Sequence, residues 1–377
     1  MRSAARLGAA LVVASALATA GCSSSSSGSA KAAASSGSAS GGVNVRQFVF
    51  GSALKHMSQA SGKRESLTKP DDIVTLGGNL FAAFQNGVDS QGEPAVSGNT
   101  DSTVVELTPS GSVVRQWDVK GKIDGLGTDT GTGQVIATVN EDGNSSLYAI
   151  TPGSANPTHY TYSKALPHKG GTDSIVYYNG KLLITASAPG TTGNAPASAP
   201  AVYAVTLKGG TADVTPYFAG NASATVVNGA SAGKKAALSL TDPDSSAVVP
   251  AGSPAFAGDF ELTSQADQEL IFTSGSGSNL SVLKVPQAID DSAWVTSASG
   301  TLYATDSTSN TIDAITGLKP GTVYTSETPC DSANAPKNCP ATGFPANSLA
   351  TVNLKTGALT PVAGTTAVTP KGLLFVP

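Results

Sequence analysis

The 377-residue sequence predicts an all-β protein built as a single β-propeller, and three observations lead to this fold class. Short apolar runs recur along the chain, with Ser, Thr, Gly, Asn and Asp in the breaks between them, as in hairpin-linked strands. Units of about four strands, most opened by an aspartate, start roughly 50 residues apart, which is typical of propeller blades. Charged residues are only 13 % of the chain, which suits an all-β extracellular protein.

The N-terminus is predicted to be an export signal over residues 1–21. Arg2 and Arg6 precede the apolar run Leu7–Ala20, which is too short to serve as a membrane-spanning anchor. The stretch Leu17–Cys22 resembles the bacterial lipobox, with Thr19 where that motif usually has Leu, and the resemblance implies that Cys22 is diacylated. An ordinary secreted protein with an incidental Cys22 is the alternative.

Residues 22–42 are almost entirely Ser, Gly and Ala, a composition that cannot form a core and predicts a flexible tether. Acyl chains on Cys22 would hold the folded part on the outer face of the cell membrane, with membrane lipid as a partner. The tether and its run of serines resemble actinobacterial lipoproteins. We therefore expect an extracytoplasmic lipoprotein.

The two remaining cysteines, Cys330 and Cys339, are predicted to form a disulfide bond. The bond would close a small Pro- and Asn-rich loop and stabilise the fold by roughly 2–3 kcal/mol. A metal site would need further His or Cys residues nearby, and a redox pair usually has the closer C-x-x-C spacing.

The propeller is predicted over residues 43–377, and Val43–Phe50 is expected to close the ring by pairing with the blade at the other end of the chain. The first three units then follow in order. Their strands are expected at 71–76, 80–84, 102–107 and 112–119; at 123–126, 133–139, 146–150 and 159–162; and at 175–178, 181–186, 201–207 and 212–218.

The later units are less regular. The stretch from Ile289 to Thr325 has four short apolar runs and is interpreted as one complete blade. The unit before it is expected at 247–249, 259–264, 269–273 and 279–285, and the last strands at 348–354, 358–362 and 371–376. Five clear units and one completed by the two termini indicate six blades. Seven is the alternative, because residues 219–240 and 326–347 are unassigned.

Two segments resemble the NHL, YVTN and gluconolactonase-like propellers: D-D-S-A-W-V-T-S-A-S-G-T-L-Y-A-T-D-S and T-P-K-G-L-L-F-V-P. The resemblance covers roughly residues 70–377 and implies the propeller architecture. In the gluconolactonase-like hydrolases a divalent metal lies at the channel mouth, held partly by a Glu early in the first blade. This sequence has no E-G-P opening, and its two tryptophans are too few for the docking motif of quinoprotein dehydrogenases, so neither activity is carried over.

Acidic residues just ahead of the innermost strands are expected to converge where the central channel opens. Crowded carboxylates repel one another unless a cation neutralises them, and Ca²⁺ is the cation that such oxygen donors suit. The alternative is that each Asp caps its own turn by accepting backbone N–H groups. The channel-mouth candidates are Asp72, Asp124, Asp173, Asp244 and Asp291, together with Asp71, Asp129, His168, Asp242 and Asp290.

Two pairs are candidates for acid–base catalysis. Asp242 and Asp244 are held two residues apart by Pro243, and His168 stands near Asp173. An acidic turn and a solvated loop are the respective alternatives. No Ser nucleophile is identified, because no G-x-S-x-G elbow is present. Trp117 and Trp294 are expected to pack between blades rather than to serve as sugar platforms.

The sequence favours a binding module for an envelope protein, a glycan or a small ligand. The alternative is a metal-dependent hydrolase of the Ca²⁺ type with its active site at the channel mouth, and a third interpretation, a surface structural protein, predicts self-association. A net charge of −4 with no Lys/Arg cluster gives no electrostatic basis for nucleic-acid binding.

Overall fold

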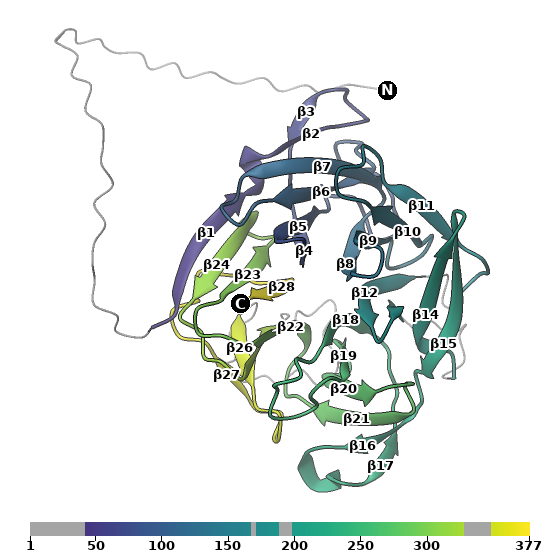
Figure 1. Cartoon of the computed structure of the whole chain (residues 1–377), viewed down its shortest axis with the longest axis vertical. Coiled ribbons are helices and arrows are strands. Elements are labelled where there is room, and N and C mark those ends of the chain that lie inside the picture. The colour runs from purple at the N-terminus through teal and green to yellow at the C-terminus, as the bar shows by residue number, and fades with distance from the viewer. Residues whose placement is uncertain (1–41, 167–170, 188–197, 328–347) are drawn as a thin grey trace, which may run out of the picture. The chain divides into compact units, whose positions relative to one another are not determined.

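The computed structural model describes residues 42–166, 171–187, 198–327 and 348–377. In this body five β-sheets form six blades around one axis, because one eight-stranded sheet contributes two of them (Figure 1). The prediction of a six-bladed β-propeller is confirmed, and the alternative of seven blades is wrong. None of the helices in the described segments has the length and apolar character needed to cross a membrane.

Blades I to III each contain four consecutive antiparallel strands, close to the predicted ranges. Blades II and III also join at their outer edges through a short parallel pairing of β11 and β15. Their strands are β4 (Pro70–Leu76), β5 (Asn79–Phe84), β6 (Asp101–Leu107) and β7 (Val113–Lys120); β8 (Ile123–Asp129), β9 (Gln134–Val139), β10 (Ser146–Ile150) and β11 (Thr158–Tyr162); and β12 (Thr172–Tyr178), β13 (Lys181–Ala186), β14 (Pro200–Lys208) and β15 (Thr211–Ala219).

Blade IV has six strands because residues that the sequence left unassigned add two strands at its outer edge. Its inner four are β18 (Pro243–Val248), β19 (Phe260–Ser264), β20 (Glu269–Ser274) and β21 (Asn279–Lys284), and the added pair is β16 (Ser223–Val226) and β17 (Lys235–Ala237). A separate hairpin of β2 (Lys55–Met57) and β3 (Arg64–Ser66) lies between β1 and blade I in the chain.

Blades V and VI exchange strands, so the interpretation of Ile289 to Thr325 as one blade is wrong. β22 (Ile289–Val295) pairs with β25 (Thr322–Glu327) in blade V, whereas β23 (Thr301–Asp306) and β24 (Thr311–Thr316) belong to blade VI. Blade V is completed by β26 (Leu349–Val352) and β27 (Leu359–Pro361).

Blade VI takes a strand from each end of the folded body. β28 (Leu373–Val376) is its innermost strand and pairs with β23, while β1 (Asn44–Phe50) is its outermost strand and pairs with β24. The prediction that the strand at Val43–Phe50 closes the ring is therefore confirmed. The first and last strands of the folded body are thus hydrogen-bonded into the same sheet, and this pairing closes the ring.

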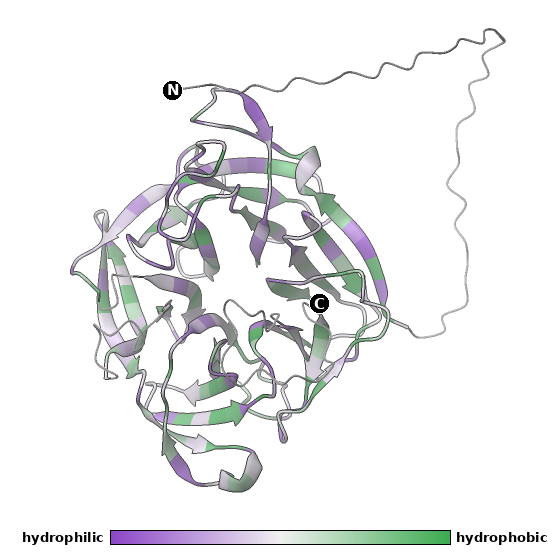
Figure 2. Ribbon diagram, turned by 180° about the vertical axis from the view of Figure 1, so that it is seen from behind, coloured by the Kyte–Doolittle hydropathy of each residue, from purple (hydrophilic) through white to green (hydrophobic). Residues whose placement is uncertain are grey.

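The core consists of six apolar clusters, each lying between two neighbouring blades. Figure 2 shows that apolar residues concentrate along the strands, as side-chain alternation across a buried sheet requires. Between blades III and IV, for example, Tyr178 and Phe218 pack on Phe260. The blades therefore pack face to face and leave the axis free for the innermost strands.

Candidate functional site

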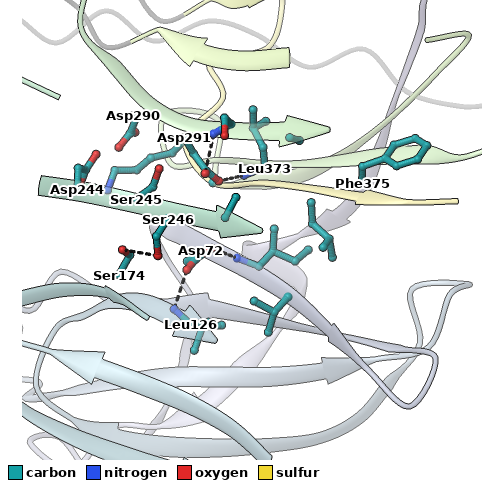
Figure 3. Close-up of a pocket in the computed structure, with 18 of the residues that line it drawn as sticks. Asp72, Leu126, Ser174, Asp244, Ser245, Ser246, Asp290, Asp291, Leu373 and Phe375 are labelled. Atoms are coloured by element: carbon teal, nitrogen blue, oxygen red, sulfur yellow. Dashed lines mark hydrogen bonds between the residues drawn. The ribbon is translucent and has the colours of Figure 1, made fainter. Parts of the chain in front are cut away.

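A cavity of about 370 Å³ lies on the propeller axis, and residues of all six innermost strands line it (Figure 3). Neighbouring innermost strands run in the same direction. For example, Gly125 of β8 lies against Asp173 of β12, and two residues further along both strands Gly127 lies against Ile175. The first residues of these strands therefore meet at one end of the cavity. The carboxyl groups that line the cavity are Asp71, Asp72, Asp124, Glu141, Asp173, Asp244, Asp290 and Asp291.

A break in the regular strand pairing occurs at the acidic residues of five innermost strands. A bulge of this kind bends the strand and re-aims its side chains. The aspartates thus lie within the first residues of the strands, not ahead of them as predicted. The breaks are Pro70/Ile73 in β4, Ile123/Gly125 in β8, Thr172/Ile175 in β12, Pro243/Ser246 in β18 and Ile289/Ser292 in β22.

The lining of the cavity changes from acidic to apolar along the axis. Just past the carboxyl groups, the Ser174 hydroxyl donates to Ser246 Oγ at 2.9 Å (Figure 3). Each further residue advances about 3.3 Å along its strand, and these later positions are mainly apolar. They include Val74, Leu126, Ile175, Val248, Trp294 and Phe375.

Asp72 and Asp291 each connect two neighbouring innermost strands. Both carboxylates accept the N–H of the following residue, at 2.6 and 2.7 Å respectively. The second oxygen of Asp72 accepts the Leu126 N–H at 2.6 Å, and that of Asp291 accepts the Leu373 N–H at 2.7 Å (Figure 3). Burial raises the pKa of Asp72 to about 7 and that of Asp291 well above its usual range, against the effect of the amide donors. In each case one donor belongs to the aspartate's own strand and the other to the innermost strand of the adjacent blade.

Two lysines neutralise part of the acidic end. Lys122 Nζ lies 2.5 Å from Asp124 Oδ1 and also pairs with Glu141, while Lys371 pairs with Asp71. Burial alone would lower the pKa of both lysines, but the neighbouring carboxylates outweigh it and raise the pKa values. Lys371 directly precedes the Gly that leads into β28, so blade VI places a lysine where the other blades place aspartates.

Asp244 and Asp290 share one hydrogen-bond donor. Gln265 Nε2 lies 2.9 Å from Asp244 Oδ2 and 3.2 Å from Asp290 Oδ1. Burial, followed by the charges of Asp290 and Asp173, raises the pKa of Asp244 well above its usual range. The neighbouring Ser245 hydroxyl is buried and makes no hydrogen bond within the described residues. Asp244 therefore keeps its proton at pH values where an exposed aspartate has lost it.

Asp173 is the carboxyl group that receives no donor within the described part of the chain, although it is only 5 % exposed. Burial, and after it the charges of Glu141 and Asp124, raises its pKa well above the usual range. Its position depends on close approach of two strands, because a Cβ at Gly125 would lie 2.6 Å from the Asp173 carbonyl oxygen. Glycine is therefore required where β8 passes β12.

Both tryptophans pack between blades. Trp117 Nε1 donates to the Ser154 carbonyl at 2.9 Å, which links blade I to blade II. Trp294 Nε1 donates to Glu261 at 2.5 Å, and the Ser292 hydroxyl donates to the other oxygen of Glu261 at 3.0 Å. Burial raises the pKa of Glu261 to about 7, against these two donors. Trp294 also lines the apolar part of the cavity.

Other predicted residues do not join the cavity. Asp129 caps its own turn by accepting the N–H groups of residues 131 and 132, as the turn-cap alternative expects. Asp242 accepts the Ala266 N–H at 3.3 Å and is not a lining residue, and because β18 begins at Pro243 the expected acidic loop pair is split. The predictions for Cys22, His168, Cys330 and Cys339 concern residues outside the described part of the chain.

The sequence analysis did not identify four residues of the acidic end: Lys122, Glu141, Gln265 and Lys371. Lys371 could have been found by aligning the segment T-P-K-G-L-L-F with the first residues of the other innermost strands, where aspartates stand. Gln265 and Glu141 stand in loops after second-position strands and carry no local signal. In the segments that the structure describes, no three His, Cys, Asp or Glu side chains are grouped so that they could hold a metal ion, and the Ca²⁺ site stays a prediction.

Comparison with known proteins gives a fold likeness only. No family model matches the chain, and no curated protein matches it. Among solved structures, a catalytically inactive virginiamycin B lyase from Staphylococcus aureus with quinupristin is 12 % identical, with 89 % of this chain and 96 % of that chain covered and a TM-score of 0.43. A streptogramin B lyase is 11 % identical (88 % and 90 % covered, TM-score 0.42), and the WD40 β-propeller domain of Doa1 is 10 % identical (86 % and 88 %, TM-score 0.39).

Proposed function

We propose that this protein is an extracytoplasmic, lipid-anchored binding protein whose central channel holds a small amphipathic molecule. The cavity carries the proposal, because it offers carboxyl groups at one end and apolar side chains further along the same six strands. Small-molecule sites typically have volumes of about 300–1,000 Å³ and combine an apolar lining with a few placed polar groups. A cavity of about 370 Å³ falls in this range.

The walls of the cavity are held in place before any ligand arrives. Asp72 joins blades I and II, Asp291 joins blades V and VI, and Glu261 joins blades IV and V through Trp294. A preformed site loses little conformational entropy on binding, so modest contacts are enough for useful affinity. This rigidity supports a binding role for the channel.

The place of action rests on the N-terminal sequence. An acylated Cys22 and the Ser/Gly/Ala tether up to residue 42 would keep the propeller at the outer face of the membrane while leaving it free to turn. We expect Cys22→Ala to abolish incorporation of labelled palmitate and to release the protein into the medium. Retention of an unlabelled Cys22→Ala protein in the membrane fraction would contradict this anchoring.

Crystallographic fragment screening tests the channel as a binding site. Crystals are soaked with neutral, anionic and cationic fragments, and we expect hits between the acidic end and Phe375. The control is Ala247→Phe, which fills the cavity from β18 and should remove these hits while leaving surface hits unchanged. Hits confined to the outer surface of the blades would overturn the proposal.

A hydrolase is the second candidate, because Asp244 and Asp290 share a donor and Asp244 has a raised pKa, as acid–base chemistry requires. Lactone or phosphoester turnover that is lost with a chelator would favour the metal-dependent form of this alternative. A Ca²⁺ titration that gives no heat and no rise in melting temperature would contradict that form.

A further inference from the structure

We propose that the ligand of the central channel is an organic cation, a primary ammonium group attached to a small apolar body. The ammonium is held by Asp173, Asp244 and Asp290, and the apolar body extends toward Trp294 and Phe375. This inference rests on the proposed function and specifies the ligand class of the same cavity.

Charge is distributed unevenly around the acidic end. Lys371 and Lys122 stand on blades VI and II, where they pair with Asp71, Asp124 and Glu141. On blades III to V, by contrast, no lysine or arginine pairs with a lining carboxyl group in the described chain. Among the described residues that line the cavity, eight carboxyl groups face a single lysine, Lys371, whose charge acts on Asp290 and Asp244 as well as on Asp71.

The three carboxyl groups on that side line the same cavity. Asp244 and Asp290 accept from the same Gln265 amide, and the charge of Asp173 acts on Asp244. Asp173 is only 5 % exposed. It lines the cavity, and its carboxyl group receives no donor from the described residues. A buried carboxyl group without a donor is costly, so it indicates a donor that the ligand brings.

An ammonium group on an apolar body matches both halves of the cavity. A primary ammonium offers three N–H donors, each of which forms a charge-assisted bond with a carboxylate. The apolar residues beyond Ser174 and Ser246 then cover the rest of the molecule, and the face of a tryptophan such as Trp294 also attracts cations. A bare metal ion would leave this apolar part without a ligand.

Binding should release protons, because carboxyl groups with raised pKa values must ionise to hold an ammonium. Affinity therefore rises with pH through the pKa range of these groups. Lys122 and Lys371 lower the pKa of Asp173 and therefore oppose part of this effect. The groups that act on Asp173 are Glu141, Asp124, Lys122 and Lys371, and those that act on Asp244 are Asp290, Asp173 and Asp242.

Isothermal titration calorimetry with three probes tests the inference. Benzylamine combines charge and an apolar body, benzyl alcohol lacks the charge, and methylamine lacks the body. We expect benzylamine to bind about ten-fold or more tightly than either of the others, with a heat that depends on the buffer because protons are released. Asp173→Asn should lower benzylamine affinity about ten-fold and leave benzyl alcohol unchanged.

Asp244→Asn is the second variant, so that misfolding of one variant does not decide the result, and Asp213→Asn on the exposed face of β15 is the matched control. Equal binding of benzylamine and benzyl alcohol would overturn the cation while leaving the channel proposal intact. Benzylamine binding that is unaffected by both cavity variants, or no binding of any probe at a ligand concentration of about 10 mM, would also overturn it. A Ca²⁺ titration with strong heat and no amine binding would replace it with a metal site.

Discussion

Glu261→Gln should leave stability nearly unchanged at pH 4 and raise it at pH 8. The Glu261 side chain is completely buried in β19, and its two oxygens accept from Trp294 and Ser292 of the next blade. A glutamine can keep both contacts, because its oxygen accepts from the indole N–H and its amide donates to the serine hydroxyl. The substitution therefore removes the titrating proton with little change in hydrogen bonding.

The magnitude follows from the pKa of Glu261, which burial raises from 4.5 to about 7. The folded state binds the proton more tightly than the unfolded state, so this group's contribution is fully present below pH 4.5 and is lost as pH rises to about 7. A shift of this size at about 1.36 kcal/mol per pH unit corresponds to about 3 kcal/mol. The glutamine side chain does not ionise, so the variant should be about 3 kcal/mol more stable than the parent at pH 8.

Urea unfolding at a series of pH values measures the difference, followed by tryptophan fluorescence. The difference in the free energy of unfolding between variant and parent should grow steadily from pH 4 to pH 7 and then level off. The control is Glu93→Gln at an exposed position, where the difference should stay near zero throughout. A Glu261→Gln protein that is less stable than the parent at pH 8 would show that an ionised Glu261 stabilises the fold, and the reasoning would be refuted.

Three further substitutions test how the ring is held together. Asp72→Asn should destabilise at pH 4 by about 1–3 kcal/mol, because an amide accepts only one of the two N–H groups and leaves the other unpaired; no loss in urea unfolding would contradict the blade connection. Gly127→Ala should lower the melting temperature clearly, since its Cβ would lie 2.5 Å from a backbone oxygen of β12, whereas Gly252→Ala, with open space around it, should not. Val49→Asp places a charge on the buried face of the closing strand β1 and should make the N-terminal segment sensitive to limited proteolysis; unchanged protease resistance would contradict its role in closure.

Local signals in the sequence predict most of the blades. The tight turns between β4 and β5 and between β12 and β13 have positive φ at Gly77, Gly78, Asn179 and Gly180, as two-residue hairpin loops require. Gly and Asn residues at these positions identify the turns, and the apolar runs beside them identify the strands. Because these hairpins join neighbours in the sequence, pattern alone was sufficient for blades I to III.

The exchange between blades V and VI could not be predicted in this way. β22 and β23 are separated by a short polar segment and look like a hairpin, yet Trp294 pairs with Val323 and Leu302 pairs with Phe375. All of these strands have the same apolar alternation, so the sequence does not specify which partner each one takes. The choice depends on closing the ring with β1 and β28, which is a property of the whole chain.

The candidate site was predictable in part for a similar reason. Repeated aspartates at the unit starts identified the residues that the bulges bring to the cavity, including Asp72, Asp173 and Asp291. Their partners depend on contacts between blades that are distant in sequence, such as Lys371 with Asp71. Whether a given carboxyl group is paired, shared or left without a donor is therefore visible only in three dimensions.

The differences among these carboxyl groups indicate which of them serve the fold. Glu261 and Asp72 have raised pKa values, but both oxygens of each accept hydrogen bonds and at least one donor comes from a neighbouring blade, so their burial is compensated by connections that stabilise the ring. The Asp173 carboxyl group has a raised pKa and receives no such donor from the described residues, so its burial costs stability without a compensating hydrogen bond among them. This difference is the reason that we propose Asp173 as a ligand-binding group, because a ligand that supplies a donor would recover the cost of burial when it enters the channel.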